Sequence, residues 1–348
     1  MKVSLLVLFV LLSAFVGAEK KRRVTLQPFS NQHGVRLGPI GLGTTTQFQY
    51  MRLDTTADSF FLIDSACKTS GCTKNRNGYH TSKSTTFREL LRLPYSTTYQ
   101  GVKSTGRIVS DKLTALGLGN PPRIVFPLVD RPAGVLQEGY GDGVLGLGFV
   151  KRPSLKLFTL FQLLSLLLSE PVFTFHMTHF NYTNTRGIHT AGLTTYGGND
   201  LDSCTENGVV HKTSRSDQWT FNLKQVQFGG VALAAGEVLI RPGPQALYGP
   251  PAEVQKILGV LRAQKDPQSG DFFVPCSSAA SLPSLAFTID STRHALKPAD
   301  YLVPDLNDRE KCVVLFAPTT PQIGSSPWFN VKQKTIAFRV PKTAASSS

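Results

Sequence analysis

Polar and apolar side chains alternate in short runs along most of this chain. From Phe48 onward, stretches of strand-like alternation are broken at short intervals by Gly, Pro and Asn, residues that favour turns. Residues 90–99 are a candidate strand of this kind. The pattern therefore predicts a mainly β protein.

Three stretches depart from this alternation. Residues 153–169 are apolar on most faces, which is typical of a buried helix, whereas residues 252–264 are amphipathic. A further apolar run covers residues 5–16 near the N-terminus. It is too short to span a bilayer, as is the run within residues 157–168, so no membrane anchor is expected.

The N-terminal run has the layout of a secretory signal. Lys2 precedes it, and Val16-Gly17-Ala18 supplies the small residues of a cleavage site. We therefore expect residues 1–18 to be a signal peptide, residues 19–37 a short N-terminal segment, and the mature protein to be extracellular, with a lysosomal location as the alternative. In that setting Asn181 begins a glycosylation sequon.

Length and charge narrow the choice of partners. The 348 residues suffice for two lobes, and 30 Gly and 22 Pro indicate a loop-rich chain. The net charge of +14 is dispersed apart from residues 20–23, so a solvated basic surface is favoured, with a polyanion such as a glycosaminoglycan as the alternative. Nucleic acid is not expected, because basic and aromatic residues do not interleave.

One acidic residue ends the first clear strand. The run from Gly41 to Asp54 starts with a glycine-bracketed turn, and hydroxylated residues that can hydrogen-bond the carboxylate follow Asp54. This stretch resembles the first active-site strand of pepsin-like aspartic proteases. The seven-residue step from Gln47 to Asp54 and the Asp-Thr pair match, whereas the family's Gly-Ser is Thr56-Ala57 here.

Further motifs follow in the order of that family. Residues 99–111 are similar to its flap hairpin, with Tyr99 as the tyrosine that closes over bound peptide. Residues 141–149 resemble its glycine-rich strand beside the active-site loop, and residues 171–177 its strand beneath both lobes. Residues 192–198 and 218–223 resemble the opening strands of its C-terminal lobe, and residues 273–276 and 282–289 resemble later strands of that lobe. The resemblance covers residues 38–338 and implies a bilobal β fold with a cleft.

The implied domain division is simple. An N-terminal pepsin-like lobe covers residues 38–185, a C-terminal lobe covers residues 186–341, and residues 342–348 form a tail.

The second catalytic position is substituted. The family needs two carboxylates that share a proton, and the second lies eight residues before a Gly-Pro pair. Counting back from Gly249-Pro250 reaches Arg241, which stays protonated and cannot act as a base. In that place Arg241 is expected to form an ion pair with Asp54 and to lower its pKa.

Five cysteines fit the same resemblance. Cys67 with Cys72, and Cys276 with Cys312, fall where pepsin-like proteins have disulfides, although spacing alone would allow other pairings. Cys204 is then left over, free or linked to another chain, and the protein is otherwise expected to be a monomer.

These observations favour a secreted pepsin-like protein without catalysis, whose cleft binds a peptide or protein and which needs no cofactor or metal. The alternatives are an endopeptidase active at acidic pH, with Asp217 or Asp290 completing the dyad, and a chain whose shortened second lobe folds poorly. The group that lies within hydrogen-bond reach of Asp54 distinguishes these three hypotheses: Arg241 for the inactive protein, a second carboxylate for the active enzyme, and no ordered group for the poorly folded chain.

Overall fold

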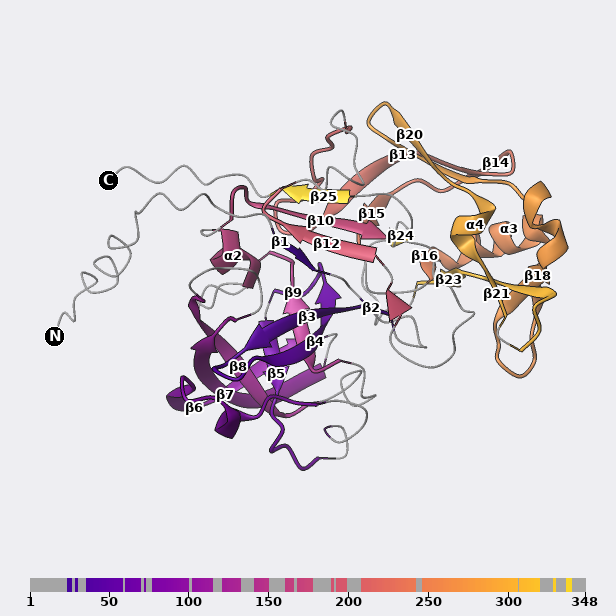
Figure 1. The fold of residues 1–348 in the computed structure, drawn as a ribbon. Helices are drawn as coiled ribbons and strands as arrows, with labels where there is room; N and C mark the ends of the chain where they lie inside the picture. The colour runs from indigo at the N-terminus through magenta and orange to yellow at the C-terminus, as the bar shows by residue number, and fades with distance from the viewer. Residues whose placement is uncertain are drawn as a thin grey trace.

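The chain forms two β lobes with a further sheet between them (Figure 1). The computed structural model describes residues 24–26, 29–30, 36–58, 60–69, 72, 77–99, 102–114, 121–132, 141–149, 160–165, 168–177, 189–190, 192–198, 208–241, 246–305, 307–319, 328–329 and 336–339. The expected mainly β, bilobal fold is confirmed.

The first lobe is built on one large sheet. Its described strands lie in the order β11-β2-β3-β4-β9-β5-β8-β7-β6. Their bounds are β2 (Phe29–Ser30), β3 (Arg36–Leu42), β4 (Gln47–Asp54), β5 (Phe60–Ile63), β6 (Arg88–Tyr99), β7 (Val102–Lys112), β8 (Arg123–Arg131), β9 (Gly143–Gly146) and β11 (His189–Thr190). A 3-10 turn, η1 (Thr81–Lys83), precedes β6. Between β3 and β4, Gly43 turns the chain with φ of 84°, a conformation that favours glycine.

The second lobe contains a main sheet in the order β20-β19-β13-β15-β24-β16-β23, with β14 paired to β13. Its strands are β13 (Thr220–Phe228), β14 (Val231–Leu233), β15 (Glu237–Leu239), β16 (Leu247–Gly249), β19 (Leu285–Ile289), β20 (Thr292–Leu296), β23 (Phe316–Pro318) and β24 (Trp328–Phe329). A smaller sheet has β17 (Gln264–Lys265), β18 (Phe272–Pro275), β22 (Lys311–Val314) and β21 (Leu302–Pro304). η4 (Cys276–Ser281) and α4 (Pro298–Tyr301) complete this lobe.

A third sheet lies between the two lobes (Figure 1). It has the order β1-β12-β10-β25, from β1 (Val24–Leu26), β12 (Gly192–Tyr196), β10 (Val172–Met177) and β25 (Ile336–Arg339). β10 is the strand expected beneath both lobes. It pairs with β25 on one side and, over the whole length of β12, with β12 on the other, and β1 pairs with β12.

The two large sheets repeat one pattern around their centres. In the first lobe β4 is parallel to β9, β9 antiparallel to β5, and β5 parallel to β8. In the second lobe β15 is parallel to β24, β24 antiparallel to β16, and β16 parallel to β23. β4 and β15 are thus equivalent strands, so Asp54 at the end of β4 and Arg241 just after β15 occupy corresponding places.

Helices are few in the described chain. The amphipathic stretch forms α3 (Pro251–Leu261), whose Val254, Ile257, Leu258 and Leu261 are buried. Within the expected buried helix 153–169, the described residues include α2 (Leu160–Ser165), with Leu160, Phe161 and Leu164 in the core, and residues 153–159 and 166–167 lie outside the described residues. None of the described helices is long and apolar enough to cross a membrane.

Both expected disulfides are present, Cys67–Cys72 and Cys276–Cys312. The proposed signal peptide 1–18, the tail 342–348, Asn181 and Cys204 lie outside the described residues, so the predictions for them stand as predictions.

Candidate active site

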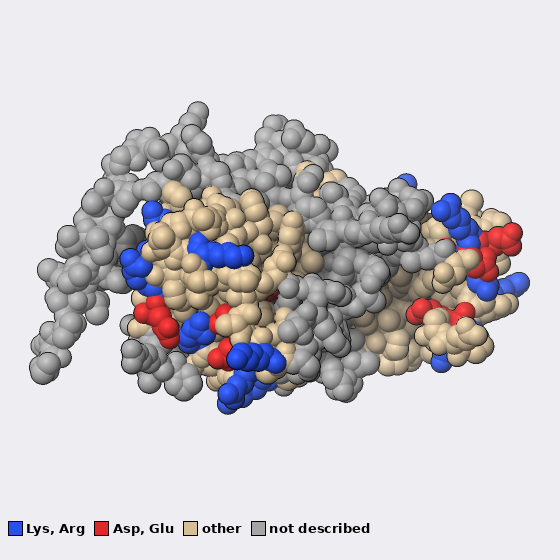
Figure 2. Space-filling view, turned by 60° about the horizontal axis from the view of Figure 1, so that its bottom comes forward, with Lys and Arg blue, Asp and Glu red and all other residues tan. Residues whose placement is uncertain are grey.

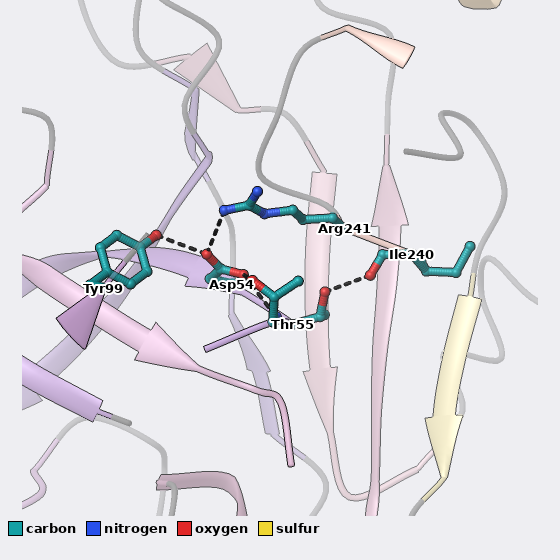
Figure 3. Close-up of polar contacts among 6 residues, drawn as sticks. Asp54, Thr55, Tyr99, Ile240 and Arg241 are labelled. Atoms are coloured by element: carbon teal, nitrogen blue, oxygen red, sulfur yellow. Dashed lines mark hydrogen bonds and ion pairs between the residues drawn. The ribbon is translucent and has the colours of Figure 1, made fainter. Parts of the chain in front are cut away.

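The ends of the equivalent strands meet between the lobes (Figure 3). Nη2 of Arg241 lies 2.9 Å from Oδ2 of Asp54 and donates a hydrogen bond to it. Only 3% of the Asp54 side chain and 10% of the Arg241 side chain are exposed. The two residues that the sequence aligned at the catalytic positions therefore form a buried ion pair.

Asp54 receives four hydrogen bonds, two on each oxygen. The backbone N–H and the hydroxyl of Thr56 donate to Oδ1, at 2.8 and 2.6 Å. The hydroxyl of Tyr99 at 2.8 Å and Arg241 at 2.9 Å donate to Oδ2. Because an ionised carboxylate offers about four acceptor sites, these donors occupy all of them.

The electrostatics favour the charged form of both partners. Burial alone raises the pKa of Asp54, but the charge of Arg241 and the hydrogen bonds from Thr56 and Arg241 outweigh it and hold that pKa below its usual value. Burial disfavours the charged form of Arg241 as well and so lowers its pKa. The charge of the facing Asp54 carboxylate opposes this, and the pKa of Arg241 lies above its usual value. Asp54 is therefore ionised and Arg241 protonated from mildly acidic to alkaline pH.

A second contact joins the two loops beside the ion pair. The Thr55 hydroxyl donates to the carbonyl of Ile240, the residue immediately before Arg241, at 2.5 Å (Figure 3). Both groups are buried. The loops are thus held together even without the charges of Asp54 and Arg241.

The glycine-rich stretch supports the Asp54 loop from behind. β9 pairs with β4, and the N–H of Gly148 bonds the carbonyl of Ala57 at 2.9 Å. A Cβ on Gly148 would stand 2.8 Å from the carbonyl oxygens of Thr55 and Ala57, so no side chain fits there. This is the close backbone approach expected for residues 141–149.

Contacts from the second lobe reach the same stretch. Trp219 donates its Nε1–H to the carbonyl of Leu147 at 2.9 Å, and its ring packs against Phe149. The indole is buried. The residues behind the site therefore connect the lobes independently of the ion pair.

The β6–β7 hairpin places Tyr99 directly on the carboxylate. Tyr99 ends β6, is 7% exposed, and packs edge-on against Phe61. Burial, followed by the charge of Asp54, raises its pKa, so its hydroxyl remains a donor. The residue predicted to close over a peptide thus contacts Asp54 itself.

Among the described residues, no hydrogen bond or ion pair joins either alternative acid to Asp54 or Arg241. Asp217 is exposed on the segment before β13. Asp290 lies in the turn between β19 and β20, where His211 Nδ1 contacts it at 2.7 Å. All partners of Asp54 in the described chain are hydrogen-bond donors, which leaves the hypothesis of a substitute carboxylate without support.

Sequence reasoning found part of this arrangement. It expected hydroxylated residues after Asp54 to bond the carboxylate, and Thr56 does so. An Asp followed two residues later by Thr is the available signal, because such a carboxylate often accepts from the backbone two residues on. The bond from Thr55 to the Ile240 carbonyl could not be predicted from the sequence, because every residue type has a backbone carbonyl.

No group of three or more His, Cys, Asp or Glu that could hold a metal ion occurs among the residues placed by the structure.

Comparison with known proteins gives a consistent result. The sequence model of the family described as eukaryotic aspartyl protease matches residues 36–328. The chain is 24% identical to cathepsin E of Mus musculus over 77% of its length and 67% of that protein's. It is also 24% identical to pepsin A of Bos taurus, over 80% of this chain and 74% of pepsin A. The identity to pregnancy-associated glycoprotein 1 of Bos taurus is again 24%, over 88% of this chain and 78% of that protein.

Proposed function

Because this chain belongs to the eukaryotic aspartyl protease family, we propose that it is a secreted member that has lost peptide-bond hydrolysis. The observation that carries the proposal is the buried ion pair of Asp54 and Arg241. It stands where an acid and its partner carboxylate would have to share a proton.

The missing step is proton transfer. In a two-carboxylate mechanism, the ionised acid takes a proton from water and the protonated acid donates one to the scissile carbonyl. Arg241 cannot accept a proton, and its pKa is too high for it to serve as a proton donor. One half of the exchange therefore has no group to perform it.

The remaining carboxylate is also a poor base. A pKa below the usual range weakens the affinity of Asp54 for a proton. Its acceptor sites are taken by Thr56, Tyr99 and Arg241. Activating a water would require it to give up one of these donors.

We assign the remaining role to binding. The central strands of both lobes are present around the pair, which supports a cleft between the lobes that holds a peptide or protein ligand without cleaving it. No cofactor is required, and we propose a monomer with Cys204 as its leftover thiol.

Secretion rests on two features. The disulfides Cys67–Cys72 and Cys276–Cys312 fit an oxidising compartment, and residues 1–18 have a signal-peptide layout. Expression in cultured eukaryotic cells should place the protein in the medium, with an N-terminus starting after Ala18. A mass shift on deglycosylation, lost in Asn181→Gln, tests the sequon.

The test of inactivity is a cleavage assay. Purified protein is incubated with denatured globin from pH 2 to 6, beside a working pepsin as positive control. We expect no fragments above background. Cleavage that pepstatin blocks and Asp54→Asn abolishes would overturn the proposal, because both signatures require a functioning acid at Asp54.

A further inference from the structure

Four cations gather at the end of the first-lobe sheet opposite to the Asp54 site. Lys83 ends η1, Arg88 begins β6, Lys112 ends β7 and Arg123 begins β8. We call these four residues the basic corner. Arg88 and Tyr99 are opposite ends of β6, so this surface is distinct from the candidate active site.

Strand pairing places three of the cations on one face. Lys112 lies directly opposite Arg123 across β7 and β8, and Arg88 lies opposite Ser110, two residues before Lys112. Residues opposite one another, or two apart on a strand, project from the same face of a sheet. Two like charges in directly opposite positions destabilise a sheet. A bound anion would reduce the repulsion between Lys112 and Arg123.

Both arginines are fixed to a single turn. Nη1 of Arg88 donates to the carbonyl of Phe87 at 2.7 Å, and Nη1 of Arg123 donates to the carbonyl of Thr86 at 2.8 Å. Both residues are nevertheless exposed. Their guanidinium groups are therefore held close together, with other N–H groups left to bind an anion.

Among the described residues, the acidic side chains next to these cations, Glu89 and Asp111, are engaged elsewhere. Residues 80–88 and 112–129 contain no Asp or Glu. Asp111 is buried, pointing inward to Tyr79 and Thr86. None of the four cations forms an ion pair with another residue that the structure describes, whereas Arg107 on the same sheet pairs with Asp64 and Glu89. Figure 2 shows several blue groups over the first lobe and fewer red ones.

We propose that the basic corner binds a linear sulfated polysaccharide. Guanidinium groups present paired donors that match the oxygens of a sulfate. The cations span β6 to β8, about 10 Å across the sheet, so a chain of repeated anions can contact them together. Hydroxyl groups of Ser82 and Thr85 are exposed beside them as further donors.

The same face is less suited to other polyanions. Tyr79 and Phe126 are buried, and Phe87 is partly covered, so the rings nearest in sequence to the four cations are not open for stacking on a base; the exposed Phe48 lies on β4, not on β6, β7 or β8. Leu90, 47% exposed, and Val125, 37% exposed, lie two residues after Arg88 and Arg123, and two such side chains are too little to insert into a lipid layer.

The probe is a heparin octasaccharide titrated into the full-length mature protein by calorimetry at several salt concentrations. We expect saturable binding that weakens steadily as salt rises. The double variants Arg88→Gln/Arg123→Gln and Lys83→Gln/Lys112→Gln should each lower the affinity by about tenfold or more, since each removes two close charges. The lysine pair makes no hydrogen bond to the turn through its side chains, so that variant also guards against misfolding of the turn.

The matched control removes two exposed arginines from the second lobe, Arg293→Gln/Arg309→Gln. It should retain the wild-type affinity. Equal losses in all three variants would show a non-specific charge effect and overturn the proposal, as would no loss in either corner variant. Tighter binding of a single-stranded oligonucleotide of equal charge, or of anionic vesicles, would overturn the assignment to a sulfated polysaccharide.

Discussion

The hydroxyl of Tyr99 donates to Oδ2 of Asp54 at 2.8 Å, which ties the tip of the β6–β7 hairpin to the carboxylate. In this structure the hairpin is therefore anchored to the residue that it would otherwise cover. A ligand that enters beside Asp54 has to replace the Tyr99 hydroxyl or leave this bond in place.

Replacing Tyr99 by Phe tests the anchor. The ring contact with Phe61 is kept, while a bond to a buried charge is lost, so we expect ~1.5–3 kcal/mol lower stability. Hydrogen exchange near residues 95–105 should become faster. Tyr301→Phe is the control, because it loses a bond to the neutral carbonyl of Pro283 in the other lobe and should leave hairpin exchange unchanged. Unchanged exchange in Tyr99→Phe would mean that the hairpin is held by other contacts.

The pH dependence of stability follows from the lowered pKa of Asp54. A carboxylate whose pKa is lower in the folded state stabilises the fold at pH values above its pKa in the unfolded chain, here 3.8. This contribution is lost as the pH falls below that value. In Arg241→Gln, burial is no longer opposed by a charge, so the pKa of Asp54 in the folded state should rise. Protonation of Asp54 at low pH should then stabilise the fold of this variant instead of destabilising it. Chemical denaturation from pH 2.5 to 7 should show the stability difference between wild type and variant shrinking on acidification. A constant difference would contradict the lowered pKa.

Fold and site were predictable to different extents. The turn at Gly43, the strand ending at Asp54 and α3 follow from local patterns that the structure reproduces, whereas both disulfides were predicted from the family resemblance and are present. The expected pairing of Arg241 with Asp54 came from counting back from Gly249-Pro250 in the family motif, and the structure contains this ion pair.

Partner choice over long distances was harder to predict. The strand character of β12 was evident, but its partner was not, because alternation reports which face is buried and not which strand lies alongside. The bond from Thr55 to the Ile240 carbonyl was hidden for a similar reason, since a backbone acceptor has no residue signature.

The two disulfides should contribute unequally. Cys276–Cys312 closes a loop with a sequence separation of 36, against 5 for Cys67–Cys72. Loop-closure entropy then makes the longer crosslink more stabilising by roughly 2 kcal/mol. Denaturant melts of the two paired Cys→Ala variants test this, and a larger loss from the Cys67–Cys72 variant would contradict it.

Restoring a carboxylate should not restore catalysis. In Arg241→Asp the new acid would face Asp54, and one of the two would have to be protonated. The flanking Pro242 and Pro244 lack N–H groups, and Gln245 lacks a hydroxyl, so the donors that orient a second carboxylate are missing. We expect no globin cleavage from pH 2 to 6. Pepstatin-sensitive cleavage by this variant would show that Arg241 alone blocks the reaction.

The ion pair itself is tested most directly by a double-mutant cycle with Asp54→Asn and Arg241→Gln. Each single change leaves one buried charge without its partner, which typically costs ~3–5 kcal/mol, whereas the double change leaves none. The account therefore predicts that the double variant, measured by denaturant melts at pH 7, is more stable than the sum of the two losses implies, by at least about 1 kcal/mol of coupling. If the two losses simply add, Asp54 and Arg241 are not paired and the proposed neutralised site is wrong.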